Sequence, residues 1–216
     1  MTRDDVFKAI DVADTDALRA LLNLDRNLAS CRSNDGLSAV LFSLYIQKPE
    51  ITDVLLEFEP ELDVFDLSAL GGVGQISHIL ATDSKVVHEY SGDGFTALHI
   101  ASYFGNADVV KLLLENGAEV DKVAMNGSDL RPLQSAVAGF HIDAVKVLLD
   151  FDPDVNVQMM GGFSPLMSAA ALGASEIVTL LLDCDADKSL KADDGRVAAN
   201  FASSAGHEEL AAVLST

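Results

Sequence analysis

The stretch 94–121, GFTALHIASYFGNADVVKLLLENGAEVD, decides the fold. It predicts two short helices joined by a tight turn. The second helix carries an apolar stripe through Val109, Leu112 and Leu113, at the i, i+3, i+4 spacing of an amphipathic helix. Gly117 then stands where a left-handed residue commonly ends a helix. A unit this small cannot bury its apolar face alone, so it must stack on neighbouring units.

The same pattern returns at a nearly fixed period along the C-terminal part of the chain. Ala101 has counterparts at Ala136, Ala169 and Ala202, at steps of 35, 33 and 33 residues. Two further columns keep this register: Leu98, Leu133, Leu166 and Ala199, and then Leu113, Leu148, Leu181 and Leu214. Three columns in register across four units indicate a repeat array rather than chance similarity.

Residues at the ends of the helices repeat as well. Thr96 precedes the first helix of its unit, where a hydroxyl side chain makes a good N-cap. Pro132 occupies the first helical turn of the next unit, where its missing N–H costs nothing. Asp152 and Asp185 take the place of Gly117, and aspartate tolerates the left-handed region better than most residues. Each unit therefore has its own start and stop signals.

The two clearest units, GFTALHIASYFGNADVVKLLLENGAEVD and GGFSPLMSAAALGASEIVTLLLDCDAD, resemble ankyrin repeats. The resemblance is strong over 93–216 and weaker over 4–92, and DVFDLSALG (63–71) with the units after it resembles bacterial ankyrin proteins in particular. It implies an all-α fold, an α-solenoid of about seven stacked repeats, each a helix–turn–helix with a β-hairpin or loop finger. We expect one domain over 1–216, with repeats at 4–34, 35–65, 66–92, 93–126, 127–160, 161–193 and 194–216.

The N-terminal half departs from the regular period at one place. Ser43 and Ala69 both fall in the Ala101 column, but the step between them is only 26 residues. The finger between these two units is therefore expected to be missing, and the array to bend or tighten there. The first unit is expected to be a cap with a polar outer side. That side would carry Arg3, Asp4, Asp5, Arg19 and Arg26.

Composition narrows the classes of partner. The formal charge is −20, from 34 acidic and 14 basic residues. Such a chain repels phosphate backbones and anionic lipid surfaces, so neither nucleic acid nor a membrane is an expected partner. The negative charge either serves solubility alone or attracts a basic protein.

Cys31 and Cys184 fit no metal spacing, so we predict that both are reduced thiols. The start of the chain, MTRDDVFKAI, has no apolar leader. From these two features we expect a cytoplasmic protein.

Motifs that suggest chemistry have a plainer explanation in the repeat. DCDADKSLKADD (183–194) resembles a calcium loop, but Lys188 stands where that loop requires glycine. GGVGQ (71–75) lacks the lysine and the preceding strand of a phosphate loop, so it predicts a helix–helix turn. His99 is expected to hydrogen-bond locally and to tie adjacent units. We therefore predict no catalytic residue, no metal site, no cofactor and no enzymatic activity.

The resemblance implies that a ligand would meet the finger tips and the exposed positions of the first helices, which form the concave face. Those positions are unexpectedly rich in aromatic and apolar residues, which favours a contact surface. The predicted partner-binding residues are Tyr90, Asp93, Phe95, Tyr103, Phe104, Met125, Asp129, Met159, Met160, Phe163 and Leu172. Packing between neighbouring units is the alternative role for several of them, above all Phe95, Phe163 and Phe104.

Two functions from different classes remain open on this basis. The first is a non-enzymatic, monomeric protein-binding module that acts by surface complementarity on a partner the sequence does not identify. The alternative is an acidic regulatory inhibitor, or immunity-type protein, that masks a basic protein. Binding that weakens with ionic strength would favour the alternative, because steered charge contacts are screened by salt.

Overall fold

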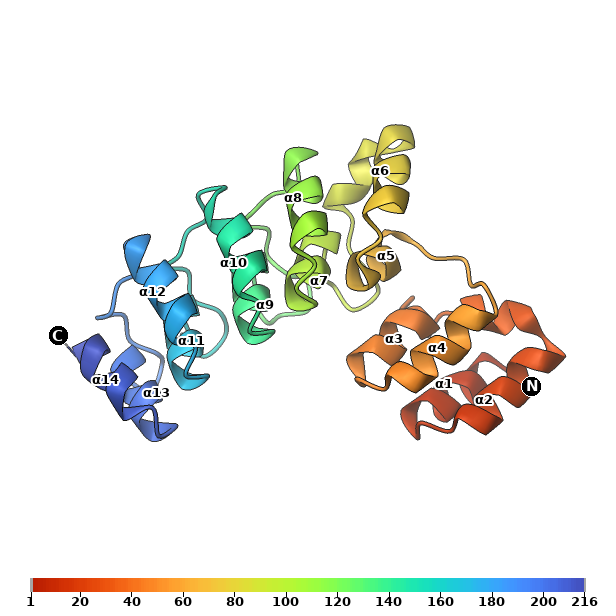
Figure 1. Ribbon diagram of the computed structural model, residues 1–216, viewed down its shortest axis with the longest axis horizontal. Coiled ribbons are helices and arrows are strands. Elements are labelled where there is room, and N and C mark those ends of the chain that lie inside the picture. The colour runs from red at the N-terminus through yellow and green to blue at the C-terminus, as the bar shows by residue number, and fades with distance from the viewer. Residues whose placement is uncertain (1, 216) are drawn as a thin grey trace.

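The computed structural model describes residues 2–215, and within this range seven pairs of short α-helices stack into an elongated array (Figure 1). The first helices of the pairs form an inner layer: α1 (Arg3–Asp11), α3 (Ala39–Tyr45), α5 (Val64–Leu70), α7 (Ala97–Tyr103), α9 (Pro132–Ala138), α11 (Pro165–Ala171) and α13 (Ala198–Ser204). The second helices form an outer layer: α2 (Thr15–Leu24), α4 (Pro49–Glu57), α6 (Val73–Thr82), α8 (Ala107–Glu115), α10 (Ile142–Leu149), α12 (Ser175–Asp183) and α14 (Glu208–Ser215). Two 3₁₀ helices, η1 (Arg26–Ser30) and η2 (Ser84–His88), follow α2 and α6. The all-α solenoid predicted from the sequence is confirmed.

The predicted start and stop signals act as expected. The Thr96 hydroxyl accepts the backbone N–H of His99 in the first turn of α7. Pro132 is the first residue of α9, where an N–H would have no helical partner. Gly117, Asp152 and Asp185 all have positive φ, at 91°, 53° and 62°, just beyond the outer helices. The same left-handed backbone conformation therefore follows the outer helix in three units, at a glycine in one and at an aspartate in the other two.

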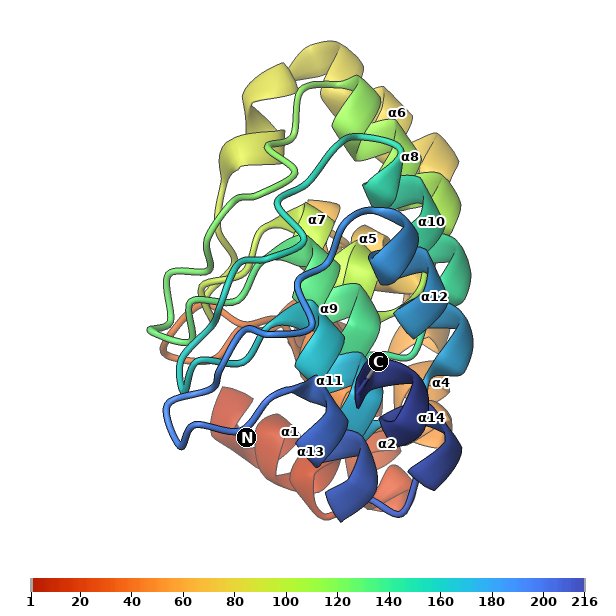
Figure 2. The same cartoon turned by 90° about the vertical axis from the view of Figure 1, so that its left-hand side faces the viewer.

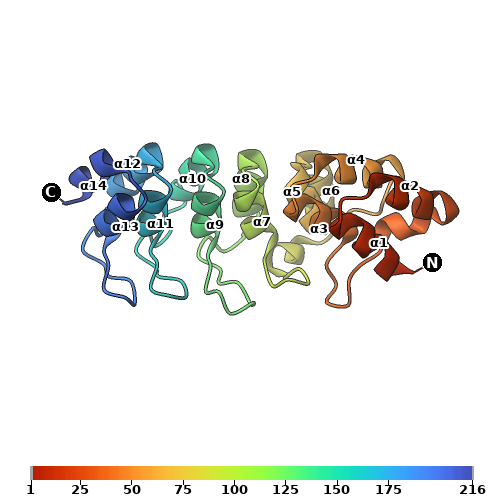
Figure 3. The ribbon, with the colours of Figure 1, turned by 90° about the horizontal axis from the view of Figure 1, so that it is seen from below.

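Fingers project from the inner layer on one side of the array (Figures 2 and 3). Three of them are closed by a single antiparallel bridge, between Arg32 and Ser38, Tyr90 and Thr96, and Met159 and Phe163. The other two are closed by hydrogen bonds of 2.9 Å, from Ala124 N–H to the Leu130 carbonyl and from Ala192 N–H to the Arg196 carbonyl. The fingers are therefore narrow loops with a β-like base.

From the second finger onward, each finger is hydrogen-bonded to the next. The bonds run from Met125 N–H to the Gly94 carbonyl (2.8 Å), from Met160 N–H to the Ser128 carbonyl (3.1 Å) and from Asp193 N–H to the Gly161 carbonyl (3.1 Å). These contacts satisfy backbone groups that would otherwise depend on water. They also fix the spacing of the fingers, so the tips form one continuous edge.

The predicted missing finger is confirmed. Residues 59–63 connect α4 to α5 without a turn or a bridge. The fingers of the flanking units, 31–38 and 90–96, then lie directly against each other: a Cβ added to Gly92 would come within 2.1 Å of the Asp35 carbonyl oxygen. The helices α1–α4 are inclined to α7–α12 in Figure 1, as expected for a bend at this point.

The apolar core divides near the same place. One buried cluster joins the helices from α5 to α14, and a second joins α1 to α4. Leu62, in the shortened linker, packs on both clusters. A small third cluster, Leu41, Ala69 and Ile100, connects α3, α5 and α7 along the concave side. This third cluster therefore adds an apolar link across the junction at the missing finger.

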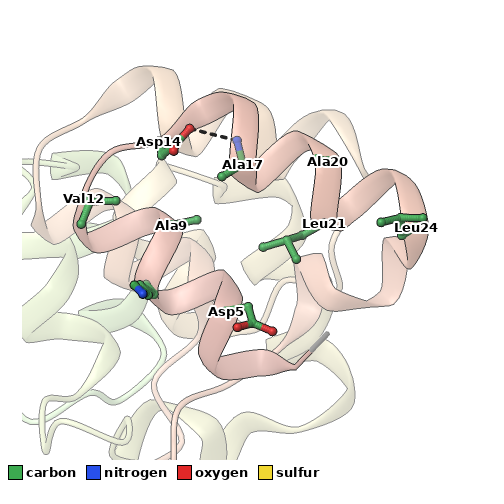
Figure 4. A pocket seen from close by; sticks show the side chains of 9 residues that line it. Asp5, Ala9, Val12, Asp14, Ala17, Ala20, Leu21 and Leu24 are labelled. Carbon is green, nitrogen blue, oxygen red and sulfur yellow. Dashed lines mark hydrogen bonds between the residues drawn. The ribbon is translucent and has the colours of Figure 1, made fainter.

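The first unit has the predicted polar outer side only in part: Asp4 and Asp5 are exposed, but two of the arginines lie elsewhere. Arg19 pairs with Glu57 and Arg26 pairs with Glu59 at 2.9 Å, so both arginines face the neighbouring pair α3–α4. The free end also shows a mostly apolar groove of about 470 Å³ between α1 and α2, which Asp5, Lys8 and Asp14 line together with apolar side chains (Figure 4). Val12 and Leu24 stand at this groove, 63% and 68% exposed. The prediction was wrong for Arg19 and Arg26, because their long side chains reach across to carboxylates of the next unit.

Candidate protein-binding surface

The concave face has an uneven distribution of side-chain size. Two residues after each position of the Ala101 column, successive inner helices or their ends carry Tyr45, Gly71, Tyr103, Ala138, Ala171 and Ser204. Residues at one register position of stacked helices lie side by side on the same face. At this register position the side chains are therefore aromatic on α3 and α7 and small on α9, α11 and α13. The corresponding residue at the end of α5 is Gly71.

Aromatic rings from the helices on either side of α5 meet on the concave face. Tyr45 and Tyr103 have ring centroids 6.4 Å apart in an edge-on arrangement, and Tyr45 stacks on Phe104 at 5.8 Å. Tyr103 and Phe104 are themselves 5.2 Å apart and nearly perpendicular. Such contacts are favourable beyond their buried area. The aromatic cluster, defined as Tyr45, Tyr103 and Phe104, joins α3 to α7 across the bend.

His99 lies beneath this cluster and has a structural role. Its Nδ1 contacts the Thr96 hydroxyl at 2.8 Å, and its Nε2 contacts the Leu130 carbonyl of the next finger at 3.1 Å. Burial lowers the pKa of the imidazole to about 4, so the ring is neutral near pH 7. A neutral ring that bonds the carbonyl carries its proton on Nε2. The predicted local hydrogen bonding, and the tie to the adjacent unit, are confirmed.

An apolar pocket opens beside the cluster, at the step from Tyr103 to Ala138. Its volume is about 170 Å³, and its surface is almost wholly apolar. The walls come from α3, α7, α9 and two fingers: Tyr45, Phe95, Ile100, Tyr103, Leu130 and Ala138, with His99 and Ser135 completing them. We call this the concave pocket. Ala138 is exposed at its edge, so the pocket is open to a ligand from the concave side.

Carboxylates surround this region on the finger tips. Asp35, Asp93 and Asp129 lie on three successive fingers, and none of them forms an ion pair within residues 2–215. Burial, with the nearby charge of Asp93, raises the pKa of Tyr45, whose hydroxyl donates to that carboxylate. The tips thus carry negative charge that the chain itself leaves uncompensated.

The structure brings some of the predicted residues together. Phe95 and Tyr103 line the concave pocket, and Phe104 packs in the aromatic cluster. Tyr90, Asp93 and Met125 line a shallow groove of about 480 Å³ across the finger tips. Asp129 is exposed at the adjoining tip with φ of 57°. Contact of these residues with a partner stays a prediction, because several of them also pack against other residues of the chain.

The remaining predicted residues lie farther along the array. Met160 and Leu172 are exposed, at 68% and 44%. Met159 is half-buried in a finger base and bridges Phe163. Phe163 packs on Phe201 with ring centroids 5.1 Å apart. Phe163 thus has the packing contact that the sequence left open. Met160 bonds the preceding finger through its backbone N–H, and its side chain is exposed.

Sequence reasoning missed Tyr45, Ser135 and Ala138, which complete the pocket. Tyr45 shares its register position with Tyr103, so the repeat alignment could have identified it. Ala138 was harder to identify because its contribution is the space that a larger side chain would fill. Within residues 2–215, no three His, Cys, Asp or Glu side chains are grouped to hold a metal ion.

The fold and this surface define a class of protein, a scaffold of stacked helix pairs that presents one continuous face made of inner helices and finger tips. A family model described as "Ankyrin repeats (3 copies)" matches residues 6–124, 68–159 and 122–192, and the chain therefore belongs to the ankyrin-repeat family. Ankyrin repeats are protein–protein interaction modules. No helix within the described residues is both long and apolar enough to cross a bilayer.

Similar proteins come from animals and from a bacterium. Human BCL-6 corepressor-like protein 1 is 32% identical over 93 residues, which are 43% of this chain and 5% of that protein. Mouse B-cell lymphoma 3 protein homolog is 42% identical over 72 residues, 33% of this chain and 16% of that protein. An ankyrin repeat protein of Rickettsia bellii is 35% identical over 69 residues, 32% of this chain and 28% of its own length. The chain thus spans less than a third of each relative.

Proposed function

We propose that this chain binds a partner protein through its concave face and finger tips, and that it does so without catalysing a reaction. The observation that carries the proposal is the concave pocket, an apolar hollow left open between Tyr103 and Ala138. Aromatic and apolar side chains around such hollows are the usual anchors of protein interfaces. The exposed Met125 and Met160 extend this surface along the finger tips.

The partner is proposed to carry positive charge. The chain has a net charge of −20, and the three tip carboxylates nearest the pocket lack ion-pair partners within the described range. Complementary charge steers encounter and excludes wrongly charged partners. We further propose a monomer in the cytoplasm, where the unpaired thiols of Cys31 and Cys184 would stay reduced.

The test compares two double variants with the same change in charge. Met125→Lys with Met160→Lys places two positive charges on the finger tips, whereas Asn116→Lys with Thr179→Lys places them at the outer helices α8 and α12. All four residues are exposed, so the fold should tolerate both variants. We expect the tip variant to capture far less of the native partner from host extract than the outer-helix variant. Equal losses for the two variants would refute a concave binding face.

A second candidate function is masking of a basic protein by this acidic chain, as an inhibitor or immunity-type protein. The uncompensated carboxylates at Asp35, Asp93 and Asp129 favour it. Masking predicts that the captured partner loses its own activity when the chain is added in equimolar amount. A partner that stays fully active in the complex would leave simple scaffolding as the function.

A further inference from the structure

The concave pocket exists because of one step in side-chain size. Tyr103 on α7 and Ala138 on α9 occupy the same register position, so a large ring stands beside a methyl group. A tyrosine at position 138 would continue the aromatic wall and fill the space. Because the alanine leaves it open, the half-buried Phe95 and Leu130 keep apolar surface toward solvent, above the buried Ile100. Covering that surface would be favourable by the hydrophobic effect.

The size of the pocket selects the occupant. An apolar cavity of about 150 Å³ holds one benzene molecule. At about 170 Å³, the concave pocket has room for one large side chain such as leucine, isoleucine, methionine or phenylalanine. It has no room for a helix face or a second anchor. A single projecting side chain therefore fits it, presented by an extended segment or a loop.

The pocket has little polar surface, and its most deeply buried polar side chain, that of His99, is already engaged. Both ring nitrogens of His99 have partners within the chain, and its lowered pKa keeps it uncharged near pH 7. The Tyr45 hydroxyl is directed to Asp93. A polar or charged side chain entering here would lose its water without gaining equivalent hydrogen bonds, which is unfavourable. The interior therefore favours an apolar group over a polar one.

Charge outside the pocket favours particular residues beside the inserted side chain, which we call the anchor. Asp93 and Asp129 lie on the two fingers that contribute Phe95 and Leu130 to the pocket, and Asp35 lies on the finger packed against the first of these. Lysine or arginine beside the anchor would meet these carboxylates at the tips. We infer that the concave pocket holds one large apolar side chain of a partner segment whose neighbouring residues are basic. This inference rests on the proposed concave binding face.

The test uses a random 12-residue peptide library displayed on phage and selected against the full chain. Enriched peptides are expected to share one leucine, isoleucine, methionine or phenylalanine with lysine or arginine on either side. The same peptides, made synthetically with the anchor changed to alanine, should bind at least about tenfold more weakly, because a buried large side chain contributes that much or more. Their affinity should also fall between 0.05 and 0.5 M salt, as the Debye length shortens.

Two matched variants locate the site. Ala138→Leu fills the pocket and should weaken the selected peptides at least about tenfold. Ser204→Leu adds the same side chain at the same register position on α13, outside the pocket, and should change affinity less than about twofold. Thermal unfolding of both variants shows that they remain folded, since both positions are exposed.

Three outcomes would overturn the inference: no peptide is enriched, the enriched peptides lack basic residues, or they bind Ala138→Leu as well as wild type. These outcomes are separate from failure of the proposed function. If the finger-tip variant loses the native partner while Ala138→Leu keeps it, the concave face stands and the pocket is not its anchor site.

Discussion

Gly92 lies where the fingers 31–38 and 90–96 close over the missing one, and its side-chain position is already occupied. A Cβ there would lie 2.1 Å from the Asp35 carbonyl oxygen and 2.7 Å from the carbonyl carbon of Gly36, both backbone atoms that cannot rotate away. Gly92→Ala should therefore lower the free energy of unfolding by about 1–3 kcal/mol. Denaturant unfolding measures the change.

Gly74 provides the control for this prediction. It is exposed near the start of α6, and a Cβ there would meet nothing within 4 Å. Gly74→Ala should raise stability by up to about 1 kcal/mol, since alanine favours a helix over glycine. If Gly92→Ala raised the free energy of unfolding as Gly74→Ala is expected to, the close approach of the two fingers would be contradicted.

Asp66 is a buried carboxyl at the same junction. It accepts hydrogen bonds from the Ser38 hydroxyl and from Asp63 N–H, while Arg32 pairs with Asp63 rather than with Asp66. Burial, with the charge of Asp63, raises the pKa of Asp66 to about 6. The folded state therefore binds this proton more tightly than the unfolded state, whose carboxyl has a pKa near 3.9.

The sign of the pH effect follows from that difference. The contribution of Asp66 to stability is full below about pH 4 and is lost as the pH rises to about 6, by up to about 3 kcal/mol. Asp66→Asn removes the titration. The stability of wild type relative to Asp66→Asn should therefore decrease between pH 4 and pH 6.5, measured by urea unfolding. A difference that is constant or that increases over this range would contradict the assigned pKa.

At the scale of helices, the register of the repeat was predictable and the consequences of its irregularities were less so. Thr96, Pro132 and Gly117 act as expected because capping depends on residues close in sequence. The cap arginines were misplaced because their partners, Glu57 and Glu59, lie in another unit. Likewise, the concave pocket depends on a side-chain size difference between two helices, which a single unit does not contain.

The divided core makes a prediction about pairs of helices. In stacked repeats each unit is stabilised chiefly by its neighbours, so a weak junction limits how far a perturbation spreads. Leu22→Ala, in the cluster of α1–α4, should increase amide hydrogen exchange in those helices and leave α9–α12 protected. Leu148→Ala, in the cluster of α5–α14, should do the reverse. Each should cost about 2–5 kcal/mol locally.

Hydrogen exchange read by mass spectrometry distinguishes the two halves. If Leu22→Ala increased exchange equally in every helix, the chain would unfold as one cooperative unit. The division of the core near Leu62 would then have no energetic consequence.

For the whole molecule, two apolar surfaces compete as the place where a partner binds. One is the concave face, with the aromatic cluster, the concave pocket and acidic finger tips. The other is the groove at the free end of α1 and α2, where Val12 and Leu24 are exposed. Exposed apolar patches commonly mark interaction sites. The concave face is favoured because charge and shape there select the same kind of partner.

The most direct measurement is a hydrogen-exchange footprint of the full chain with its captured native partner. We predict new protection at the fingers 90–96 and 124–130 and at the C-terminal ends of α7 and α9, which border the concave pocket. Protection confined to the outer helices α8 and α10, or to α1 and α2 at the free end, would contradict binding through the concave face.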